Sequence, residues 1–561
     1  MKKNLFTCFL ALLCLAGSPS SAQGRVADSP PGFSLVDTTG SVGQEGGIPS
    51  ARVGEGSVLI YGELVNPDSL APLLLVTTPY YLDPNSSYLR SEQEIVPQPG
   101  EFFDGVLNPK VQKFSAVLEL GARPGYFSLL LGDRPLLEDF LVYPDDSLKL
   151  SLDLLRMEVL FAGRNAAFYE AQYAVKREQR RSYFDAPRQL ITSRNAKLFK
   201  RPESLAKMAE FEGQFGAELL VLEPGKESLD YLLAGLENPV GLERQIAVLD
   251  RFADQLSLEE YDLLRAETVC GFYYSGLSSY RKFHHPYVES LPEAEKNAYR
   301  NRVGKLISEV KGQDFGLETR LVSAAFMNLG LELVILDAIW EGKSFLAAVD
   351  EAYSGEVADR IRAAYLSNYL SALPDQENYI NKFLAVTKTY PWRERILSLE
   401  RSHIPGDTII PVSMVGLDGK TYDREDLTGK PTLLYFYFST CSHSADYFKK
   451  HLFPLYQQTA DLGYQLIAVS VDQDPELWKS RIDRYSDPSI LNLNLREEDK
   501  ERWRSYYELY AYPKTMLLDE AGRIVDFDIR NLGTDSGSFR AGFLKLYHKE
   551  ILHTPFPANN L

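Results

Sequence analysis

Three hydrophobic patterns follow one another along the chain. From Val58 to Gly163, short apolar runs such as "VLIYGELV", "FSAVLELG" and "GYFSLLLG" are separated by turn residues. Leu148, Leu150 and Leu152 alternate with polar residues, which places them on one face of a strand. Several short strands at this spacing predict a β-sandwich over residues 56–163.

The pattern becomes helical over residues 164–401. Apolar residues recur three and four positions apart in "NAAFYEAQYAVKREQRRSYF", "SLAKMAEFEGQFGAELLVL", "SLEEYDLLRAETVCGFYYSGL" and "EVADRIRAAYLSNYLSAL". Ser257 and Glu260 have the spacing of a capping box at the start of one helix. We therefore expect an all-α middle region.

Residues 402–552 show a third pattern. The runs "TLLYFYF" (432–438) and "YQLIAVSVD" (464–472) are continuously apolar, which is typical of strands buried on both faces. Helical segments follow each run, and "KTMLLDEAGRIVDFD" predicts two strands around a glycine turn. The predicted fold class is thus multidomain, with an N-terminal β-sandwich, a middle all-α region and a C-terminal α/β domain with mixed strand pairing.

The first residues have the pattern of a secretory signal. Lys2 and Lys3 precede a short apolar core and a small-residue site that ends at Ala22. We expect cleavage after Ala22, followed by a flexible leader over residues 23–55 that is rich in Gly, Ser and Pro. No later stretch reaches membrane-spanning length, so no membrane insertion is expected after cleavage.

Acidic residues outnumber basic ones, 77 to 60, which gives a formal net charge of −17. Loss of Lys2 and Lys3 with the signal would make this −19. Such a charge disfavours nucleic acid and anionic membranes as partners. The composition leaves the oligomeric state open.

Two of the four cysteines, Cys8 and Cys14, would leave with the signal, so that Cys270 and Cys441 remain. Cys270 lies on an apolar helical face, and burial in the core is the simpler interpretation. A disulfide between Cys270 and Cys441 is the alternative. Cys441 occurs in "FYFSTCSHSADY", at the end of a predicted buried strand and the start of a helix.

The C-terminal region resembles the thioredoxin superfamily. The resemblance is carried by "GLDGKTYDREDLTGKPTLLYFYFSTC", "LIAVSVDQDPELWKSRI" and "YAYPKTMLLDEAGRIV", in the family's order, and covers roughly residues 405–550. The branch that it is most similar to is the exported thiol–disulfide oxidoreductases, near the alkyl hydroperoxide reductase/thiol-specific antioxidant group. This chain differs in its single-cysteine motif, Cys-Ser-His-Ser, because Ser444 stands where the family has a resolving cysteine.

The resemblance implies roles for five residues. Cys441 would be the nucleophile, His443 would stabilise the thiolate, and Ser444 would offer it a hydrogen bond. Tyr512 and Pro513 would hold an extended substrate, with Pro513 as the family's cis-proline. The resemblance also implies a periplasmic location, no cofactor, and thiols or disulfides of proteins or small molecules as partners.

Two functions remain open at this point. Without a second thiol, Cys441 could carry out monothiol exchange, in which an external thiol releases the mixed disulfide. Alternatively, the domain is a non-catalytic module or scaffold that recognises a polypeptide without redox change. Tyr435 stands where thioredoxins have a buried aspartate, so a proton acceptor for thiol turnover is not evident.

Other candidates are weaker. His284 and His285 are adjacent and would point apart, and no nearby ligand completes a metal set. Asp472 and Asp474 lack the spacing of a calcium loop. We therefore predict no metal site.

Overall fold

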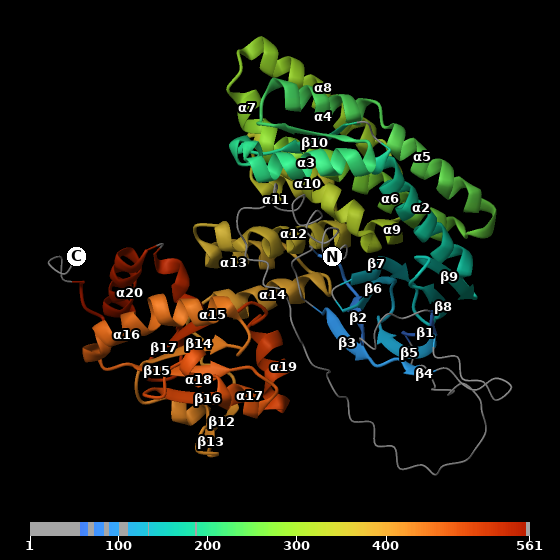
Figure 1. Cartoon of the computed structure of the whole chain (residues 1–561). Helices are drawn as coiled ribbons and strands as arrows, with labels where there is room; N and C mark the ends of the chain where they lie inside the picture. Colours follow the sequence, from blue (N-terminus) through green and yellow to red (C-terminus); the bar gives the residue numbers. More distant parts are fainter. Residues whose placement is uncertain are drawn as a thin grey trace. The chain divides into compact units, whose positions relative to one another are not determined.

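The computed structural model describes residues 56–65, 72–82, 89–99, 110–132, 134–185, 188–533 and 535–556. The predicted signal peptide and leader lie outside these ranges. Contacts divide the chain into two compact units, an N-terminal one that ends at Asn368 and a C-terminal one that begins at Tyr369. Figure 1 shows a sheet-rich start, a helical middle and a C-terminal sheet domain.

The N-terminal unit begins with two sheets, ordered β4-β5-β1-β8-β9 and β3-β2-β6-β7. Residues of both sheets share one hydrophobic core, and Leu148, Leu150 and Leu152 lie in it as their alternation predicts. The strands are β1 (Ser57–Val65), β2 (Leu73–Thr78), β3 (Ser91–Ile95), β4 (Gln98–Pro99), β5 (Val111–Glu119), β6 (Gly125–Leu131), β7 (Arg134–Val142), β8 (Ser147–Asp153) and β9 (Glu158–Gly163).

Helices make up most of the rest of this unit. The Ser257–Glu260 capping box is present at the start of α6, as predicted. The helices are α2 (Ala166–Phe184), α3 (Pro202–Phe215), α4 (Lys226–Glu237), α5 (Val240–Leu249), α6 (Leu258–Ser279), α7 (His285–Glu289), α8 (Glu293–Lys311), α9 (Leu317–Val322), α10 (Ala324–Glu341), α11 (Phe345–Ala352) and α12 (Gly355–Tyr369).

The expectation of an all-α middle region is wrong in one place. β10 (Arg188–Thr192) and β11 (Glu218–Leu222) form a two-stranded parallel sheet among the helices. The sequence pattern extends a helix through "GAELLVL", but α3 ends at Gly216, which has a left-handed φ of 68°. Glycine adopts this conformation without strain, so it ends the helix and releases the apolar run into a strand.

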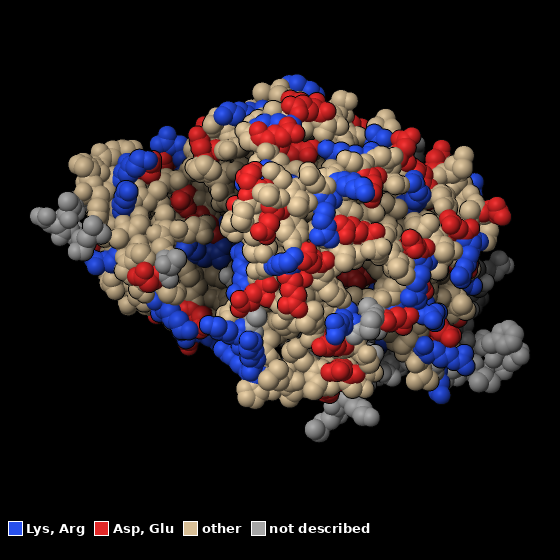
Figure 2. Space-filling model, turned by 90° about the horizontal axis from the view of Figure 1, so that it is seen from above, with Lys and Arg blue, Asp and Glu red and all other residues tan. Residues whose placement is uncertain are grey.

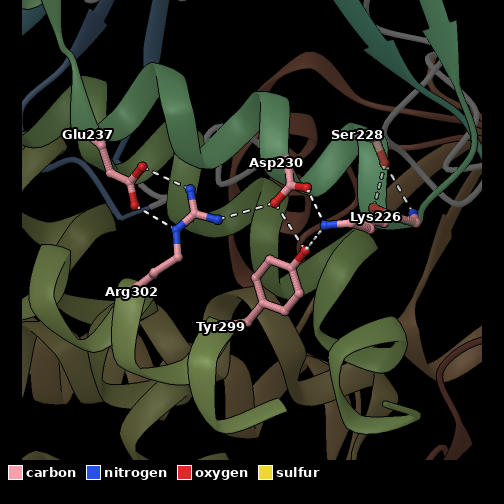
Figure 3. A network of polar contacts seen from close by, with 7 residues as sticks. Lys226, Ser228, Asp230, Glu237, Tyr299 and Arg302 are labelled. Atoms are coloured by element: carbon pink, nitrogen blue, oxygen red, sulfur yellow. Dashed lines mark hydrogen bonds and ion pairs between the residues drawn. The ribbon is translucent and has the colours of Figure 1, made fainter. Parts of the chain in front are cut away.

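Polar side chains join α4 to α8 on the surface of this unit (Figure 3). Lys226 Nζ donates to Asp230 at 2.9 Å, and the Tyr299 hydroxyl donates to the other oxygen of Asp230 at 3.0 Å. Arg302 donates two hydrogen bonds of 2.8 Å each to Glu237. Every charge in this network therefore has a partner of opposite sign.

The C-terminal unit is built on a seven-stranded mixed sheet with the order β13-β12-β16-β15-β14-β17-β18. β14 pairs in parallel with β15 and antiparallel with β17, which agrees with the predicted mixed pairing. The strands are β12 (Ser413–Gly416), β13 (Thr421–Asp423), β14 (Thr432–Tyr437), β15 (Gln465–Ser470), β16 (Leu491–Leu495), β17 (Lys514–Leu518) and β18 (Ile524–Asp526).

Helices accompany this sheet, and hydrophobic clusters lie on its two faces. One cluster contains Tyr435 and Tyr437 of β14, and the other contains Leu434 and Phe436. The helices are α13 (Gln376–Val386), α14 (Trp392–His403), α15 (Ser442–Tyr447), α16 (Phe453–Thr459), α17 (Pro475–Ser480), α18 (Ile482–Tyr485), α19 (Glu497–Tyr506) and α20 (Ser536–Glu550). The sequence pattern puts a boundary at residues 401 and 402, where helical periodicity ends, whereas the contacts group α13 and α14 with the sheet.

The surface carries both signs of charge. On the face shown in Figure 2, Lys and Arg groups are interspersed with Asp and Glu groups. Within the part of the chain that the structure describes, no helix combines the length and the apolar character needed to cross a membrane.

A buried histidine makes the stability of the N-terminal unit depend on pH. His284 is fully buried, and neither ring nitrogen has a hydrogen-bond partner in the described structure. Burial lowers its pKa from 6.5 to about 4, since the charged form would lose its hydration. Between these two values the unfolded chain binds a proton that the folded chain does not, so stability falls as the pH falls.

We predict that His284→Leu flattens the pH dependence of unfolding between pH 6.5 and 4. His284 contributes about 3 kcal/mol of change in the free energy of unfolding across this window, at about 1.4 kcal/mol per pH unit, and the variant should lose this contribution. Hydrogen exchange of the α6 amides over this pH range measures it, with exposed His443→Leu as the control. An unchanged slope in His284→Leu would show that His284 does not set the pH dependence.

Candidate functional site

Cys441 lies just beyond the carboxyl end of β14, at the position that precedes α15. Its N–H donates to the carbonyl of Phe438 at 3.1 Å, which closes a tight turn after the strand. The backbone at Cys441 is extended (φ −80°, ψ 106°), and α15 begins with Ser442. The thiol is half-buried, as expected for a group that a partner molecule must reach.

The sulfur of Cys441 faces the loop before β17. Cys441 Sγ lies 3.7 Å from the carbonyl oxygen of Tyr512. The Tyr512–Pro513 peptide bond is cis, the isomer that the resemblance implies. The Tyr512 N–H has no backbone acceptor in the described structure, and strand pairing with β14 begins only at Lys514. An unpaired N–H beside the thiol can donate a hydrogen bond to a carbonyl group of an extended polypeptide.

An aromatic pair closes one side of this site. The rings of Phe438 and Tyr512 are 5.6 Å apart and nearly perpendicular, at 85°. This edge-to-face contact joins the two loops that bring the thiol and the cis-proline together.

Ser444 is fully buried beneath the thiol-bearing turn. Its carbonyl accepts a hydrogen bond of 2.8 Å from the hydroxyl of Tyr435 on β14. Its own hydroxyl has no hydrogen-bond partner in the described structure, so it does not bond to the Cys441 sulfur here. The hydroxyl is therefore a buried polar group without compensation, and such groups call for an explanation.

His443, like its neighbour Ser442, faces solvent. Its side chain is exposed and makes no hydrogen bond or ion pair with any described residue. The neighbouring Asp446 is also exposed and pairs with Lys450 at 3.0 Å. Neither side chain contacts the sulfur in this structure.

Sequence reasoning missed the residue that anchors the cysteine loop, which is Asp472. This carboxylate lies just beyond β15 and accepts hydrogen bonds from the Ser439 N–H at 2.8 Å and the Ser439 hydroxyl at 2.5 Å. Ser470 adds a third donor at 2.6 Å. Asp472 is 33 positions from Ser439 in the sequence, so only the parallel pairing of β14 and β15 brings them together.

A buried ion pair supports the opposite side of the site. Glu508, with a φ of +52°, lies just after the end of α19 and a few residues before Pro513. Its carboxylate binds the guanidinium of Arg395 and accepts a hydrogen bond of 2.9 Å from Ser398, both on α14. The contact joins α14 to the loop that leads to Pro513, and removal of one partner would leave the other charge uncompensated at a largely buried position.

Two further ionisable groups lie close to each other on β17 and β18. Burial lowers the pKa of Lys514, and nearby carboxylates including Asp528 and Asp526 oppose this shift. Burial raises the pKa of Asp526. The sequence did not indicate that these two residues are buried, because their burial depends on how the strands of the sheet pack in the folded domain.

The remaining candidates do not form a site. Both cysteines are free, and Cys270 is 1% exposed in the hydrophobic core of the N-terminal unit, where burial raises its thiol pKa. Among the described residues, no group of three or more His, Cys, Asp and Glu side chains could hold a metal ion.

Comparisons with known proteins concern the C-terminal unit. A family model described as thioredoxin-like matches residues 429–524, the segment that contains Cys441 and Pro513. A search of curated protein sequences finds no match.

Solved structures that are similar to part of the chain include three from Bacteroides. The thioredoxin domain of a thiol-disulfide oxidoreductase from Bacteroides vulgatus is 22% identical, with a TM-score of 0.22, over 25% of this chain and 96% of that one. A thiol:disulfide interchange protein from Bacteroides sp. is 22% identical, with a TM-score of 0.24, over 28% and 95%. A thioredoxin-like protein from Bacteroides caccae is 13% identical, with a TM-score of 0.26, over 51% and 94%.

These scores are too low to support a function. The domain assignment rests on the family model together with the mixed sheet, the position of Cys441 and the cis-proline. Residues 429–524 form a thioredoxin-like domain within a larger multidomain chain.

Proposed function

We propose that the C-terminal unit carries out thiol–disulfide exchange with Cys441 as its single nucleophile. The observation that carries this proposal is the position of the half-buried sulfur between the start of α15 and the Tyr512 carbonyl before cis-Pro513. The N–H groups of residues 442–444 have no backbone acceptor, so they favour negative charge near the sulfur.

The reaction needs an external thiol. The Cys441 thiolate attacks one sulfur of a substrate disulfide, forms a mixed disulfide and releases the other sulfur as a thiolate that takes up a proton. Cys270 is buried in the other unit and Ser444 has no sulfur, so the mixed disulfide must await a thiol from a second molecule. That thiol, as its thiolate, attacks the substrate sulfur of the mixed disulfide. Cys441 leaves as a thiolate and the substrate becomes disulfide-bonded to the second molecule, so the exchange needs no further oxidant or reductant.

In this proposal Tyr512 and Pro513 hold the substrate backbone, His443 stabilises the thiolate and Ser444 lies beneath the sulfur. The unpaired Tyr512 N–H supports the first role. A small rotation of the uncompensated Ser444 hydroxyl would let it donate to a thiolate, which would satisfy its missing hydrogen bond. The His443 side chain is exposed and makes no hydrogen bond or ion pair with a described residue, so a change of its rotamer toward the sulfur breaks no such interaction.

A second candidate function is polypeptide recognition without redox change. The observation that favours it is the replacement of the buried carboxylate by Tyr435, whose hydroxyl is committed to the Ser444 carbonyl. In that case the Tyr512–Pro513 segment would bind an extended polypeptide through its unpaired N–H, and the thiol would be inert.

We also propose that the chain is exported to the periplasm after cleavage at Ala22, with the two-sheet region acting as a β-sandwich domain. The signal-like sequence of residues 1–22 supports export. Thiols and disulfides of proteins or small molecules, rather than nucleic acid, are the proposed partners, in keeping with the net charge of −17.

We predict that Cys441 in the folded protein reacts with iodoacetamide at pH 7 at least as fast as free cysteine, whereas Cys270 does not react. Exposure and the unpaired N–H groups of α15 favour attack by Cys441, and burial protects Cys270. Mass spectrometry of alkylated peptides, with Cys441→Ala and Cys270→Ala as controls, measures this. A Cys441 thiol that reacts only after unfolding would leave the recognition function in its place.

We predict that Ser444→Cys shortens the lifetime of the mixed disulfide formed with a model disulfide such as oxidised glutathione by about tenfold or more. Side chains three positions apart at a helix start lie about 5–6 Å apart, within reach of a disulfide. The new thiol would then displace the bound partner without an external reductant.

Ser442→Cys is the matched control, because residue 442 is exposed and adjacent residues on a helix do not face each other. Quenched time courses followed by intact-mass measurement give the lifetimes. Equal lifetimes for Ser444→Cys and the unmodified protein would show that residue 444 cannot reach the sulfur of Cys441.

A further inference from the structure

A cavity of about 260 Å³ lies inside the N-terminal unit. Its walls come from β6 and β7 on one side and from α2, α5, α6 and α10 on the other. Typical sites for drug-sized ligands measure about 300–1,000 Å³, so this cavity suits a smaller molecule. Its lining residues all belong to the N-terminal unit, so binding in this cavity is independent of the proposed redox function.

A lysine without a counterion lines the cavity. The Lys176 ammonium donates one hydrogen bond of 2.9 Å, to the carbonyl of Glu138, and lies 5.5 Å from the ring centroid of Phe140. It has no ion-pair partner among the described residues, although burial lowers its pKa. An ammonium has three donors, so two remain for a ligand.

Glu267, whose carboxylate also lines the cavity, has one oxygen that accepts hydrogen bonds and one that accepts none from the described residues. Glu267 Oε1 accepts hydrogen bonds from the Tyr126 hydroxyl at 2.9 Å, the Ser323 hydroxyl at 2.6 Å and the Ala325 N–H at 3.1 Å. Glu267 Oε2 accepts none from the described residues. The three bonds hold the carboxylate rigidly at the start of α10, and the second oxygen remains available at the cavity.

A bulge in β7 adds a second carboxylate. Phe127 pairs with Phe140 and Leu129 with Leu137, so that Glu138 and Asp139 together lie opposite Ser128. Asp139 has a φ of +48°, which is strained for a residue with a side chain. Bulges commonly redirect a side chain beside a functional site. Here the same bulge presents the Asp139 carboxylate at the cavity and the Glu138 carbonyl to Lys176.

We propose that this cavity binds a compact zwitterion, an α-amino acid or a dipeptide. The ligand carboxylate would bind Lys176, and its ammonium would bind Glu267 Oε2 and Asp139. The cavity groups carry both signs but form no ion pair with one another in the described structure, in contrast to the fully paired network of Figure 3.

Other ligand classes satisfy these groups less well. A neutral sugar would displace water from the charged groups of Lys176, Glu267 and Asp139 without forming an ion pair with any of them, and this loss of hydration is unfavourable. An anion would pair Lys176 but oppose both carboxylates, and a simple cation would leave Lys176 unpaired. The amide of Asn328, which also lines the cavity, can bond to the peptide group of a dipeptide.

Binding is tested on the full chain by differential scanning fluorimetry with each of the twenty amino acids and a panel of dipeptides, followed by titration calorimetry of any hit. We expect at least one saturable ligand, with its methyl ester and its N-acetyl derivative each bound at least about tenfold more weakly. That factor corresponds to about 1.4 kcal/mol for each lost charged contact.

Lys176→Met is the decisive variant, since Lys176 makes only one hydrogen bond, and we expect it to weaken binding at least about tenfold. Lys226→Met, which removes a paired surface lysine, serves as the matched control and should bind like the unmodified protein. Glu267→Gln should also weaken binding, and its melting temperature is compared because Glu267 supports the start of α10. Absence of any ligand in the panels, equal binding of the ester and N-acetyl derivatives, or full binding by Lys176→Met would overturn the proposal.

Discussion

All six side chains of β14 are buried, and the five from Leu433 to Tyr437 alternate between two hydrophobic clusters on opposite faces of the C-terminal sheet. Burial of each large apolar side chain contributes about 1.5–3 kcal/mol. A shift of register by one residue would move every one of these side chains into the cluster on the opposite face, where the packing is built for a different set. Because β14 also pairs with β15 and β17, its carboxyl end is fixed relative to both neighbours. The turn that carries Cys441 starts from this end, and the loop with Pro513 leads into β17. The position of the sulfur therefore depends on the burial of the central strand.

Polar contacts fix the positions of the two loops at the site more closely than hydrophobic burial does. Asp472 binds Ser439 at the end of β14, and Glu508 binds Arg395 and Ser398 of α14 a few residues before Pro513. A buried carboxylate is costly unless its hydrogen bonds are satisfied, and both of these carboxylates have several donors. The two loops that meet at the thiol are thus each held by a carboxylate from a different part of the chain. Ser444 is the exception, since its buried hydroxyl has no partner.

The two units present different chemistry. The C-terminal site has one sulfur beside a cis-proline, and it lacks a second thiol to complete an internal redox cycle. The cavity of the N-terminal unit has unpaired charges of both signs, held by a β-bulge and by the start of α10. The two proposals therefore rest on separate units and can be tested separately.

The sequence determined the order of the three regions, because hydrophobic periodicity reports burial one element at a time. It identified β14 and β15 from continuous apolar runs, the capping box of α6, and the position of Cys441 between strand and helix. It did not indicate β16, whose Asn492 and Asn494 are polar yet buried. The Asn494 amide binds the carbonyl of Asp472, 22 positions away, which only the folded chain brings near. The sequence pattern likewise predicted a helix through β11, where the left-handed Gly216 ends α3 and pairing with β10 forms a strand instead.

The partners of Asp472, Glu508, Lys176 and Glu267 are mostly distant in sequence, and local patterns contain no information on such contacts. Tertiary structure alone determined which charges are paired and which remain available, because burial and partner distance follow from the packing of separate elements.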